Sequence, residues 1–310
     1  MSKANDILKM LSTLSKNVET GFDEFLSKLT PTTGESEAAK SHRASILQCL
    51  NDNFEIENYF QSGSFGNGTS IAGFSDVDRF VCISTKELPK NSRIFLNKIY
   101  RVINNRFPRS TVKIRRPAIV IPFGRDAKES TDIIPAIHAG EMESGHSIYD
   151  IPNFSAGWME SYPEAHTDYV RETDKEYNGR VRPLIRFIKA WKYYCKVPIS
   201  SFYLELQVVK YVKERKSIVY DWDITRIFQF LRNSNYSPIE DPFDDSNLIE
   251  PFTKKPNFFD ALANNRDTAK NKLNRALNFS EKAVQARDKG DNKRALHFWN
   301  IVFNGNFPKT

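Results

Sequence analysis

A turn rich in glycine, serine and threonine lies between two segments of strand-like composition, and it is the feature that most constrains the fold. Residues 54–60 are rich in aromatic and β-branched side chains, which is typical of a strand. The turn follows at 63–73, and a second strand is expected over 76–84, DVDRFVCIS. Glycine lets backbone N–H groups approach a phosphate closely. The order of strand, glycine turn and strand therefore predicts a phosphate-binding loop held on a β-sheet.

Asp76 and Asp78 lie two residues apart on the second of these strands. Because side chains alternate along a strand, both carboxylates are expected on one face. Two carboxylates beside a phosphate-binding turn are suited to Mg²⁺ that bridges protein and triphosphate. The alternative is an ordinary pair of carboxylates at a strand end or turn. The turn lacks Gly-Lys-Ser/Thr, so it is not a Walker loop.

A third aspartate, Asp132, lies in the otherwise apolar strand expected at 130–134. A carboxylate in such a strand is costly to bury unless it is paired or bound to metal. If it converges on the first two, the three carboxylates complete a two-metal site. One ion would then activate an acceptor hydroxyl, and the other would stabilise the leaving pyrophosphate. The alternative is a solvent-facing aspartate on an edge strand.

The remaining pattern places most of the helices in the second half of the chain. Its 310 residues correspond to about two domains of roughly 150 residues each. We expect an α+β fold with a catalytic sheet lobe at 1–160, including N-terminal helices, and an α-helical lobe at 161–310. Strands are expected at 112–115, 118–123 and 130–134, and a long loop at 234–256. Helices are expected at 5–29, 36–51, 92–106, 165–178, 181–194, 202–214 and 223–233, followed by two antiparallel helices within 258–300.

Composition narrows the function without deciding it. The 45 basic and 38 acidic residues give a net charge of +7, which suits nucleotide phosphates or nucleic acid but is also common in proteins that bind neither. The three cysteines form no Cys-x-x-Cys pair and the five histidines show no zinc spacing. No apolar run approaches the roughly 18 residues that a membrane helix needs. We therefore expect a cytoplasmic protein that does not act at a membrane.

The segments GSFGNGTSIAGFSDVDRFV at 63–81 and DIIPA at 132–136 resemble the polymerase-β-type nucleotidyltransferases. More narrowly, they are similar to the branch that holds the 2′-5′-oligoadenylate synthetases, cyclic GMP–AMP synthase and the bacterial CD-NTases. The layout most resembles the CD-NTases, through to WNIVFNGNFP at 299–308. The resemblance implies a polymerase-β-like sheet lobe, a C-terminal helical lobe and a central cleft between them.

The resemblance also implies roles in the sheet lobe. Gly63 and Ser64 would hold the donor triphosphate. Asp76 and Asp78 would bind two Mg²⁺ ions, which Mn²⁺ can replace. Asp132 would bind the catalytic ion and align the acceptor hydroxyl.

Three residues of the helical lobe match nucleotide-binding positions of the family. Lys189 would contact the triphosphate, Ser201 would touch phosphate, and Phe202 would stack on the donor base. The family often has Tyr at the position of Phe202, so a hydroxyl contact is absent here. The alternatives are a solvated helix lysine and a phenylalanine of the core.

The implied function is synthesis of a cyclic di- or trinucleotide second messenger from ribonucleoside triphosphates, with purines (ATP, GTP) expected, in CBASS-type anti-phage defence. One alternative is a linear 2′-5′-oligonucleotide synthase or a transferase acting on RNA ends. Another is a catalytically silent nucleic-acid-binding protein. The implied partners are a cyclic-nucleotide-activated effector, ubiquitin-like conjugation machinery at the C-terminus and a nucleic-acid activator.

Overall fold

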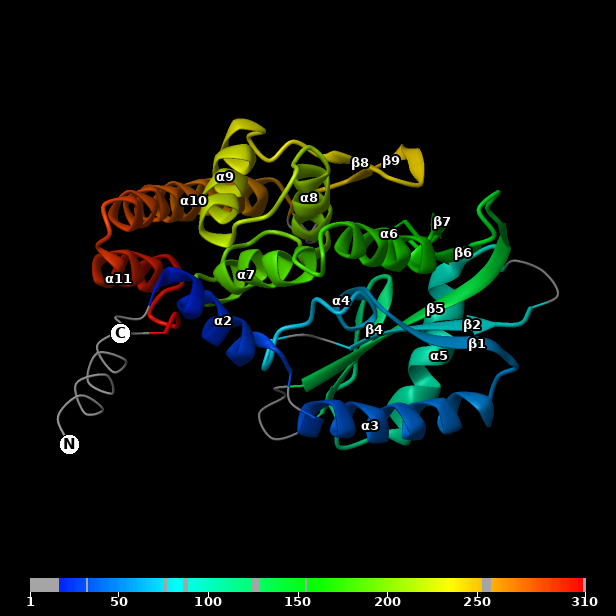
Figure 1. Ribbon diagram of the computed structural model, residues 1–310. Helices are drawn as coiled ribbons and strands as arrows, with labels where there is room; N and C mark the ends of the chain where they lie inside the picture. The colour runs from blue at the N-terminus through cyan, green and yellow to red at the C-terminus, as the bar shows by residue number, and fades with distance from the viewer. Residues whose placement is uncertain are drawn as a thin grey trace, which may run out of the picture. The chain divides into compact units, whose positions relative to one another are not determined.

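The computed structural model describes residues 17–31, 33–74, 77–85, 89–123, 129–153, 155–252 and 258–308. The chain forms two compact units, drawn in Figure 1. The sheet unit comprises residues 30–176, and the helical unit comprises residues 1–29 together with 177–310. From the sequence, the sheet lobe was expected at 1–160, so both the first and the last residue of this unit differ from the expected ones. The helix before residue 30 belongs to the helical unit, and residues 161–176 belong to the sheet unit.

The sheet unit is built on a mixed sheet whose strand order is β1-β2-β5-β4-β3, extended by β6, which pairs with β5, and β7, which pairs with β6. Among the strand pairs in the described part of the chain, β2 and β5 run parallel and the others antiparallel. The sequence-based fold class is confirmed, although β6 and β7 were not expected. The strands are β1 (Ile56–Ser62), β2 (Val77–Ile83), β3 (Lys113–Arg115), β4 (Ala118–Phe123), β5 (Glu129–Glu141), β6 (Ser147–Pro152) and β7 (Trp158–Ser161).

Two helices cover one face of this sheet, α3 (Thr33–Asn51) and α5 (Ser92–Arg106) (Figure 1). Val81 of β2 and Ile133 of β5 belong to the same buried cluster as Ile99 of α5. Residues of opposite parity on the same strands, such as Phe80 and Ala136, belong to a separate cluster. The sheet unit also contains the short α4 (Gly63–Gly66) and α6 (Pro163–Glu176). The apolar alternation of β2 and β5 thus fixes which face turns toward α3 and α5.

The helical unit consists of α2 (Val18–Leu29), α7 (Val181–Tyr194), α8 (Ser201–Lys213), α9 (Tyr220–Asn233), α10 (Phe258–Asp288) and α11 (Asn292–Val302). A hairpin of β8 (Ile239–Asp241) and β9 (Asp244–Ile249) replaces part of the loop expected at 234–256. Residues 5–16 of the first expected helix lie outside the described residues.

Aromatic packing explains why α2 belongs to the helical unit. Phe22 lies edge-on to Phe187 and Trp299, at centroid distances of 5.0 and 5.1 Å. Phe25 lies 4.6 Å from Phe303. Both rings of α2 are buried. The apolar face of α2 is thus covered by α7 and the C-terminal segment, which no local pattern in the sequence reveals.

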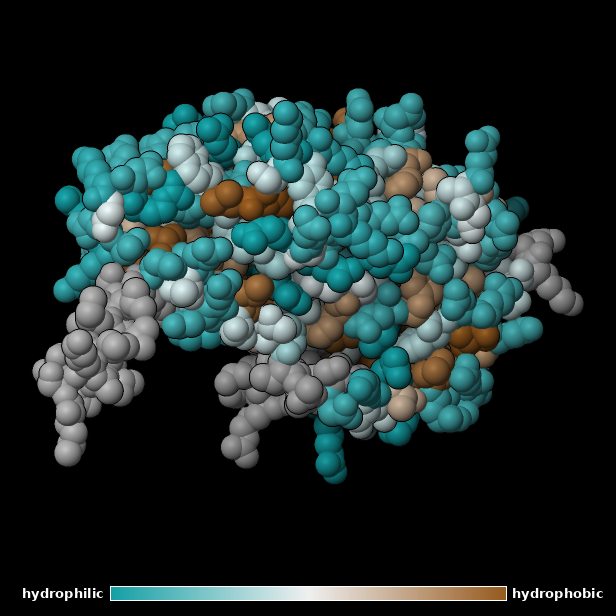
Figure 2. Space-filling view, viewed as in Figure 1, coloured by the Kyte–Doolittle hydropathy of each residue, from teal (hydrophilic) through white to brown (hydrophobic). Residues whose placement is uncertain are grey.

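The face of the molecule drawn in Figure 2 is mostly hydrophilic. Figure 2 shows hydrophilic residues over most of the viewed face and hydrophobic residues in small separate groups. Among the described residues, no helix is both long and apolar enough to cross a membrane. At the C-terminal end, Phe307 and Pro308 are buried, and residues 309–310 lie outside the described part.

Candidate active site

Asp78 and Asp132 are direct neighbours on the parallel strands β2 and β5. Paired residues on adjacent strands direct their side chains to the same face, and such strands lie about 4.8 Å apart. Their parity is that of Phe80 and Ala136, so the carboxylates lie on the face opposite α3 and α5. Asp132 is 5% exposed, whereas Asp78 is partly exposed. The structure therefore brings these two predicted site residues together.

The glycine turn packs directly against Asp78. Gly63 has a φ of +58°, and a Cβ built on it would lie 1.9 Å from Asp78 Oδ2. Only glycine leaves room for this approach of backbone and carboxylate. Backbone bonds from Asn67 N to Gly63 O (2.9 Å) and from Thr69 N to Ser64 O (2.8 Å) close the turn. Gly63 is thus held against Asp78, with Ser64 next to it in the turn, and their contact with a triphosphate stays a prediction.

Arg115 is a component of this site that sequence reasoning missed. Its Nη2 donates to Asp132 Oδ2 at 2.5 Å. The register from β3 through β4 to β5 also places Lys113 on the same face as Asp132. The Arg115 side chain is 61% exposed, so water screens the pair and its contribution to stability is small. One sign of this residue was present in the sequence, a strand with basic residues expected at 112–115. The local sequence does not show that this strand lies one strand away from Asp132, with β4 between them.

The donor set of the carboxylate pair suits a hard divalent cation, which prefers oxygen ligands. The Arg115 guanidinium already places a positive charge against Asp132. Within the described ranges, no three histidine, cysteine, aspartate or glutamate side chains form a metal-binding group. Asp76, the third predicted ligand, lies outside those ranges. The described residues thus supply two of the three predicted ligands.

Lys189 is buried within the helical unit, so the alternative of a solvated helix lysine is wrong. Its side chain has no exposed surface, and its Nζ donates to Glu205 Oε1 at 2.6 Å. The pair joins α7 to α8. A buried charge without an opposite charge beside it is strongly unfavourable. Lys189 and Glu205 are tolerated here because each neutralises the charge of the other. The predicted contact of Lys189 with a triphosphate stays a prediction.

Ser201 opens α8 and accepts a hydrogen bond from Lys192 Nζ at 2.5 Å. The Tyr193 hydroxyl lies 3.1 Å from the same Ser201 oxygen. Phe202 is partly exposed, so its ring is not a fully buried core residue. Lys192 was not selected from the sequence, because its spacing in the helix gave no reason to prefer it to Lys189 as the lysine that contacts phosphate. The structure thus places a partly exposed ammonium beside Ser201.

A protein-family model matches nearly the whole sheet unit, together with α2 before it. The model of the Second Messenger Oligonucleotide or Dinucleotide Synthetase domain (SMODS) matches residues 17–174, just over half of the chain. This stretch holds the glycine turn and all three aspartates. The chain belongs to this family, the bacterial CD-NTases. The sequence-based family assignment is thereby confirmed.

Curated relatives agree with this assignment. A probable cyclic nucleotide synthase of Bacillus cereus (strain VD146) is 25% identical over 283 residues, covering 79% of this chain and 81% of the relative. A cyclic AMP-AMP-AMP synthase of an Acinetobacter species is 23% identical over 314 residues, covering 93% and 85%. Like these members of its family, the chain is a nucleotidyltransferase that makes cyclic oligonucleotides.

Solved structures confirm the fold. CdnC of Escherichia coli MS115-1, solved with ATP, superposes with a TM-score of 0.71 at 18% identity, over 94% of this chain and 99% of that one. The cyclic AMP-GMP synthase DncV of Vibrio cholerae, solved with a linear intermediate, gives a TM-score of 0.64 at 16% identity, over 81% and 70%.

Proposed function

We propose that this CD-NTase joins ribonucleoside triphosphates, with purines expected, into a cyclic di- or trinucleotide second messenger by two-metal catalysis. The observation that carries the proposal is the pairing of Asp78 with Asp132 on parallel strands, with the Gly63 backbone against Asp78. In each step an acceptor ribose hydroxyl oxygen attacks the α-phosphorus of the donor. The new P–O bond forms as the bond to the β-phosphate oxygen breaks, and pyrophosphate leaves with the electron pair.

The glycine turn would hold the donor. Gly63 and Ser64 lie beside the carboxylate pair, and the Ser64 hydroxyl can donate to a phosphate oxygen. The close fit of the Gly63 backbone against Asp78 fixes the distance between turn and carboxylates. Holding reactants in a fixed geometry supplies a large part of the rate in phosphoryl transfer.

Asp132 would orient the acceptor. Its carboxylate can accept the hydrogen bond of the ribose hydroxyl and favour loss of that proton during attack. Arg115 acts as a positioning residue, because its guanidinium fixes the Oδ2 side of Asp132. Lys113 adds positive charge on the same face, where the polyphosphate bears negative charge.

Two Mg²⁺ ions would be held by Asp78, Asp132 and Asp76, and Mn²⁺ can replace them. When bound, they supply positive charge to the leaving pyrophosphate and increase the acidity of the acceptor hydroxyl.

The family resemblance assigns further nucleotide contacts to residues of the helical unit. Ser201, with the neighbouring Lys192 ammonium, offers a hydroxyl and a positive charge to phosphate oxygens. Phe202 offers a ring on which a base can stack, an interaction worth about 1–3 kcal/mol and tolerant of base identity. The Lys189 contact requires that its ion pair with Glu205 open, so we assign the phosphate contact to Lys192 in addition to Lys189.

A second transfer would close the ring. The first step leaves a linear intermediate with a 5′-triphosphate, which serves as donor for its own free hydroxyl once it turns in the site. If it leaves before turning, the product is a linear oligonucleotide, the alternative that the sequence left open.

We place the enzyme in CBASS defence, where its product would activate an effector. Relatives support this setting, because two curated relatives are CBASS oligonucleotide cyclases and one solved CdnC structure holds a HORMA protein. A HORMA-type regulatory protein is thus a proposed partner here. A nucleic-acid activator and ubiquitin-like conjugation at the C-terminus remain proposals from the family resemblance.

The test is pyrophosphate release from mixed ribonucleoside triphosphates by the purified protein in Mg²⁺. Asp78→Asn and Asp132→Asn should each lower the rate by at least about 10³-fold, because each removes charge where the transition state requires it. Asp150→Asn, a change on β6 of the same sheet, is the matched control and should leave the rate unchanged. Wild-type rates in either site variant would refute the proposal.

A further inference from the structure

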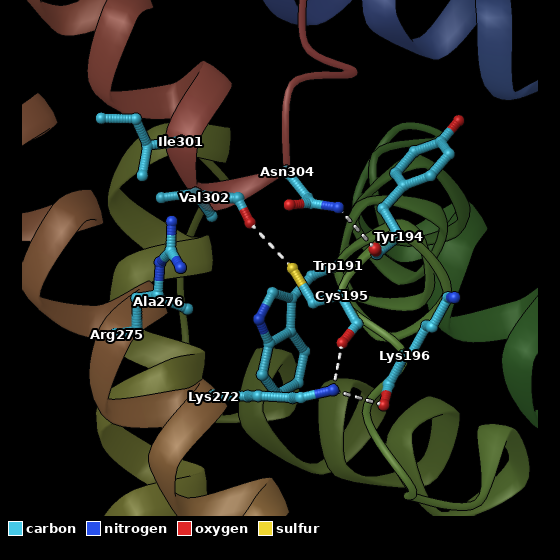
Figure 3. Close-up of a pocket in the computed structure, with 10 residues that line it drawn as sticks. All are labelled: Trp191, Tyr194, Cys195, Lys196, Lys272, Arg275, Ala276, Ile301, Val302 and Asn304. Carbon is cyan, nitrogen blue, oxygen red and sulfur yellow. Dashed lines mark hydrogen bonds between the residues drawn. The ribbon is translucent and has the colours of Figure 1, made fainter.

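The helical unit contains a cavity of about 320 Å³ that none of the roles above uses. It lies where the end of α7 meets α10 and the end of α11 (Figure 3). Its lining residues are Trp191, Tyr194, Cys195, Lys196, Lys272, Arg275, Ala276, Ile301, Val302 and Asn304. A volume of this size is at the lower end of small-molecule sites.

The lining is positively charged. Lys196, Lys272 and Arg275 are basic, and among the described residues no acidic side chain lines the cavity. Lys272 is fixed in place, because its Nζ donates to the carbonyl oxygens of Cys195 at 2.5 Å and Lys196 at 2.8 Å. Those carbonyls carry no net charge, so the ammonium charge is not neutralised by them. The Arg275 guanidinium lies 5.9 Å from the Phe279 ring.

A buried donor also faces this region. The Trp191 side chain is fully buried, and its Nε1 has no hydrogen-bond acceptor within the described residues. A buried donor without a partner is costly, and Trp191, unlike the similarly buried Trp299, borders a cavity in which a ligand can supply the acceptor. In Figure 3 the indole nitrogen of Trp191 is turned toward the side on which Arg275 and Ala276 lie.

We propose that this cavity binds a small organic anion that carries a phosphate or carboxylate group on a planar or apolar body. The anionic oxygens would accept hydrogen bonds from the Trp191 indole and the Arg275 guanidinium, near the Lys272 ammonium. The body would pack on Ala276, Ile301 and Val302, which supply an apolar wall. This site lies within the helical unit, and it is independent of the proposed catalytic step.

The experiment follows the four tryptophan indole N–H signals of the ¹⁵N-labelled full chain by NMR, with Trp191→Phe assigning the Trp191 signal. The probes are phenyl phosphate, benzoate and inorganic phosphate, added separately. The Trp191 signal should shift saturably with phenyl phosphate, with benzoate or with both, and the stronger of the two identifies the head group. Inorganic phosphate should bind more weakly, because it lacks the apolar body. Trp299 provides an internal control, since its Nε1 is likewise buried without an acceptor among the described residues but does not line the cavity.

A matched pair of variants tests the charge. Arg275→Gln should weaken binding of the preferred probe by about tenfold or more, because it removes a charge-assisted hydrogen bond. Arg294→Gln makes the same change at an exposed arginine that also lies over a ring, Phe298, and should have no effect. The absence of a Trp191 shift with both aromatic probes would overturn the proposal, as would equal affinities in the two variants.

A second readout uses the half-buried thiol of Cys195 on the cavity wall. The preferred probe should slow its alkylation by iodoacetamide in the wild type and not in Arg275→Gln. Unchanged alkylation in the wild type at a saturating probe concentration would also overturn the proposal.

Discussion

Replacing Gly63 by alanine tests the geometry of the turn more sharply than any other single change. The substitution adds one methyl group at a residue whose φ is +58° and whose Cβ would lie 1.9 Å from Asp78 Oδ2. Real Cβ contacts below 3.0 Å are essentially never seen, so the carboxylate or the turn must move by more than 1 Å. The change leaves every charge of the site in place.

Two effects of this substitution can be separated. A non-glycine residue in the left-handed region costs about 1–3 kcal/mol of stability. The displacement of Asp78 acts on the reaction instead, and a misplacement of about 1 Å can lower a rate by about 10²-fold. We therefore expect Gly63→Ala to lose activity far beyond what its stability change explains.

The assay is pyrophosphate release at saturating triphosphate and Mg²⁺, combined with urea unfolding of each variant. Gly145→Ala is the matched control, because Gly145 also has a positive φ, +81°, but no atom within 4 Å of a built Cβ. Gly145→Ala should lose similar stability and keep its activity. The reasoning fails if Gly63→Ala retains more than about a third of wild-type activity, or if both variants lose activity equally.

Three further predictions concern the helical unit. Lys189→Met should lower the free energy of unfolding by about 3–5 kcal/mol in urea, because it leaves the Glu205 carboxylate buried and unpaired; the double variant Lys189→Met/Glu205→Leu should recover most of this loss, and a single-variant loss below about 1 kcal/mol would contradict the buried pair. Phe307→Ala should also cost about 3–5 kcal/mol, since its ring lies 5.0 Å from Phe22 and 5.1 Å from Phe25; unchanged urea unfolding would show that the C-terminal segment is not packed. Burial raises the pKa of the Cys195 thiol, with Lys272 and Arg275 opposing. Because the thiolate is the reactive form, the alkylation rate of native Cys195 should reach half its maximum at a higher pH than in the urea-unfolded chain; an equal or lower midpoint would contradict this assignment.

Local sequence patterns were sufficient to predict helix bounds where the helix is determined by its own residues and its cap. The helices expected at 92–106 and 181–194 have the bounds that the structure gives them. At the first of these, Asn91 caps the helix by accepting hydrogen bonds from the backbone N–H groups of Arg93 and Ile94. The period of two along β2 predicts that Asp76 and Asp78 share one face; this stays a prediction, because Asp76 lies outside the described residues.

Contacts between distant segments set the limits of prediction. The strand expected at 130–134 continues to Glu141 as β5, past Pro135. Pro135 is tolerated because, on the edge away from β2, the pairing with β4 ends at Ile133 and that with β6 begins at Ile137. Arg115 depends on the same tertiary register, because it meets Asp132 only once β3, β4 and β5 are aligned.

The helical unit shows the same limit. The local sequence is compatible with Lys189 as a solvated helix lysine. Its burial depends on Glu205 of α8, which lies against it in the folded chain. The placement of α2 depends on aromatic rings more than 150 residues away along the chain, including that of Phe187. Neither partner is visible from the local sequence.

The central claim is that Asp78 and Asp132, the carboxylate pair on β2 and β5, catalyse the synthesis of a cyclic oligonucleotide. The most direct measurement incubates the purified protein with Mg²⁺ and all four labelled ribonucleoside triphosphates, treats the product with phosphatase and determines its mass. The account predicts a phosphatase-resistant product with the mass of a cyclic di- or trinucleotide, formed by the wild type and by Asp150→Asn but not by Asp132→Asn. Linear products that lose their 5′ phosphate groups to the phosphatase, or a cyclic product formed equally by Asp132→Asn, would contradict it.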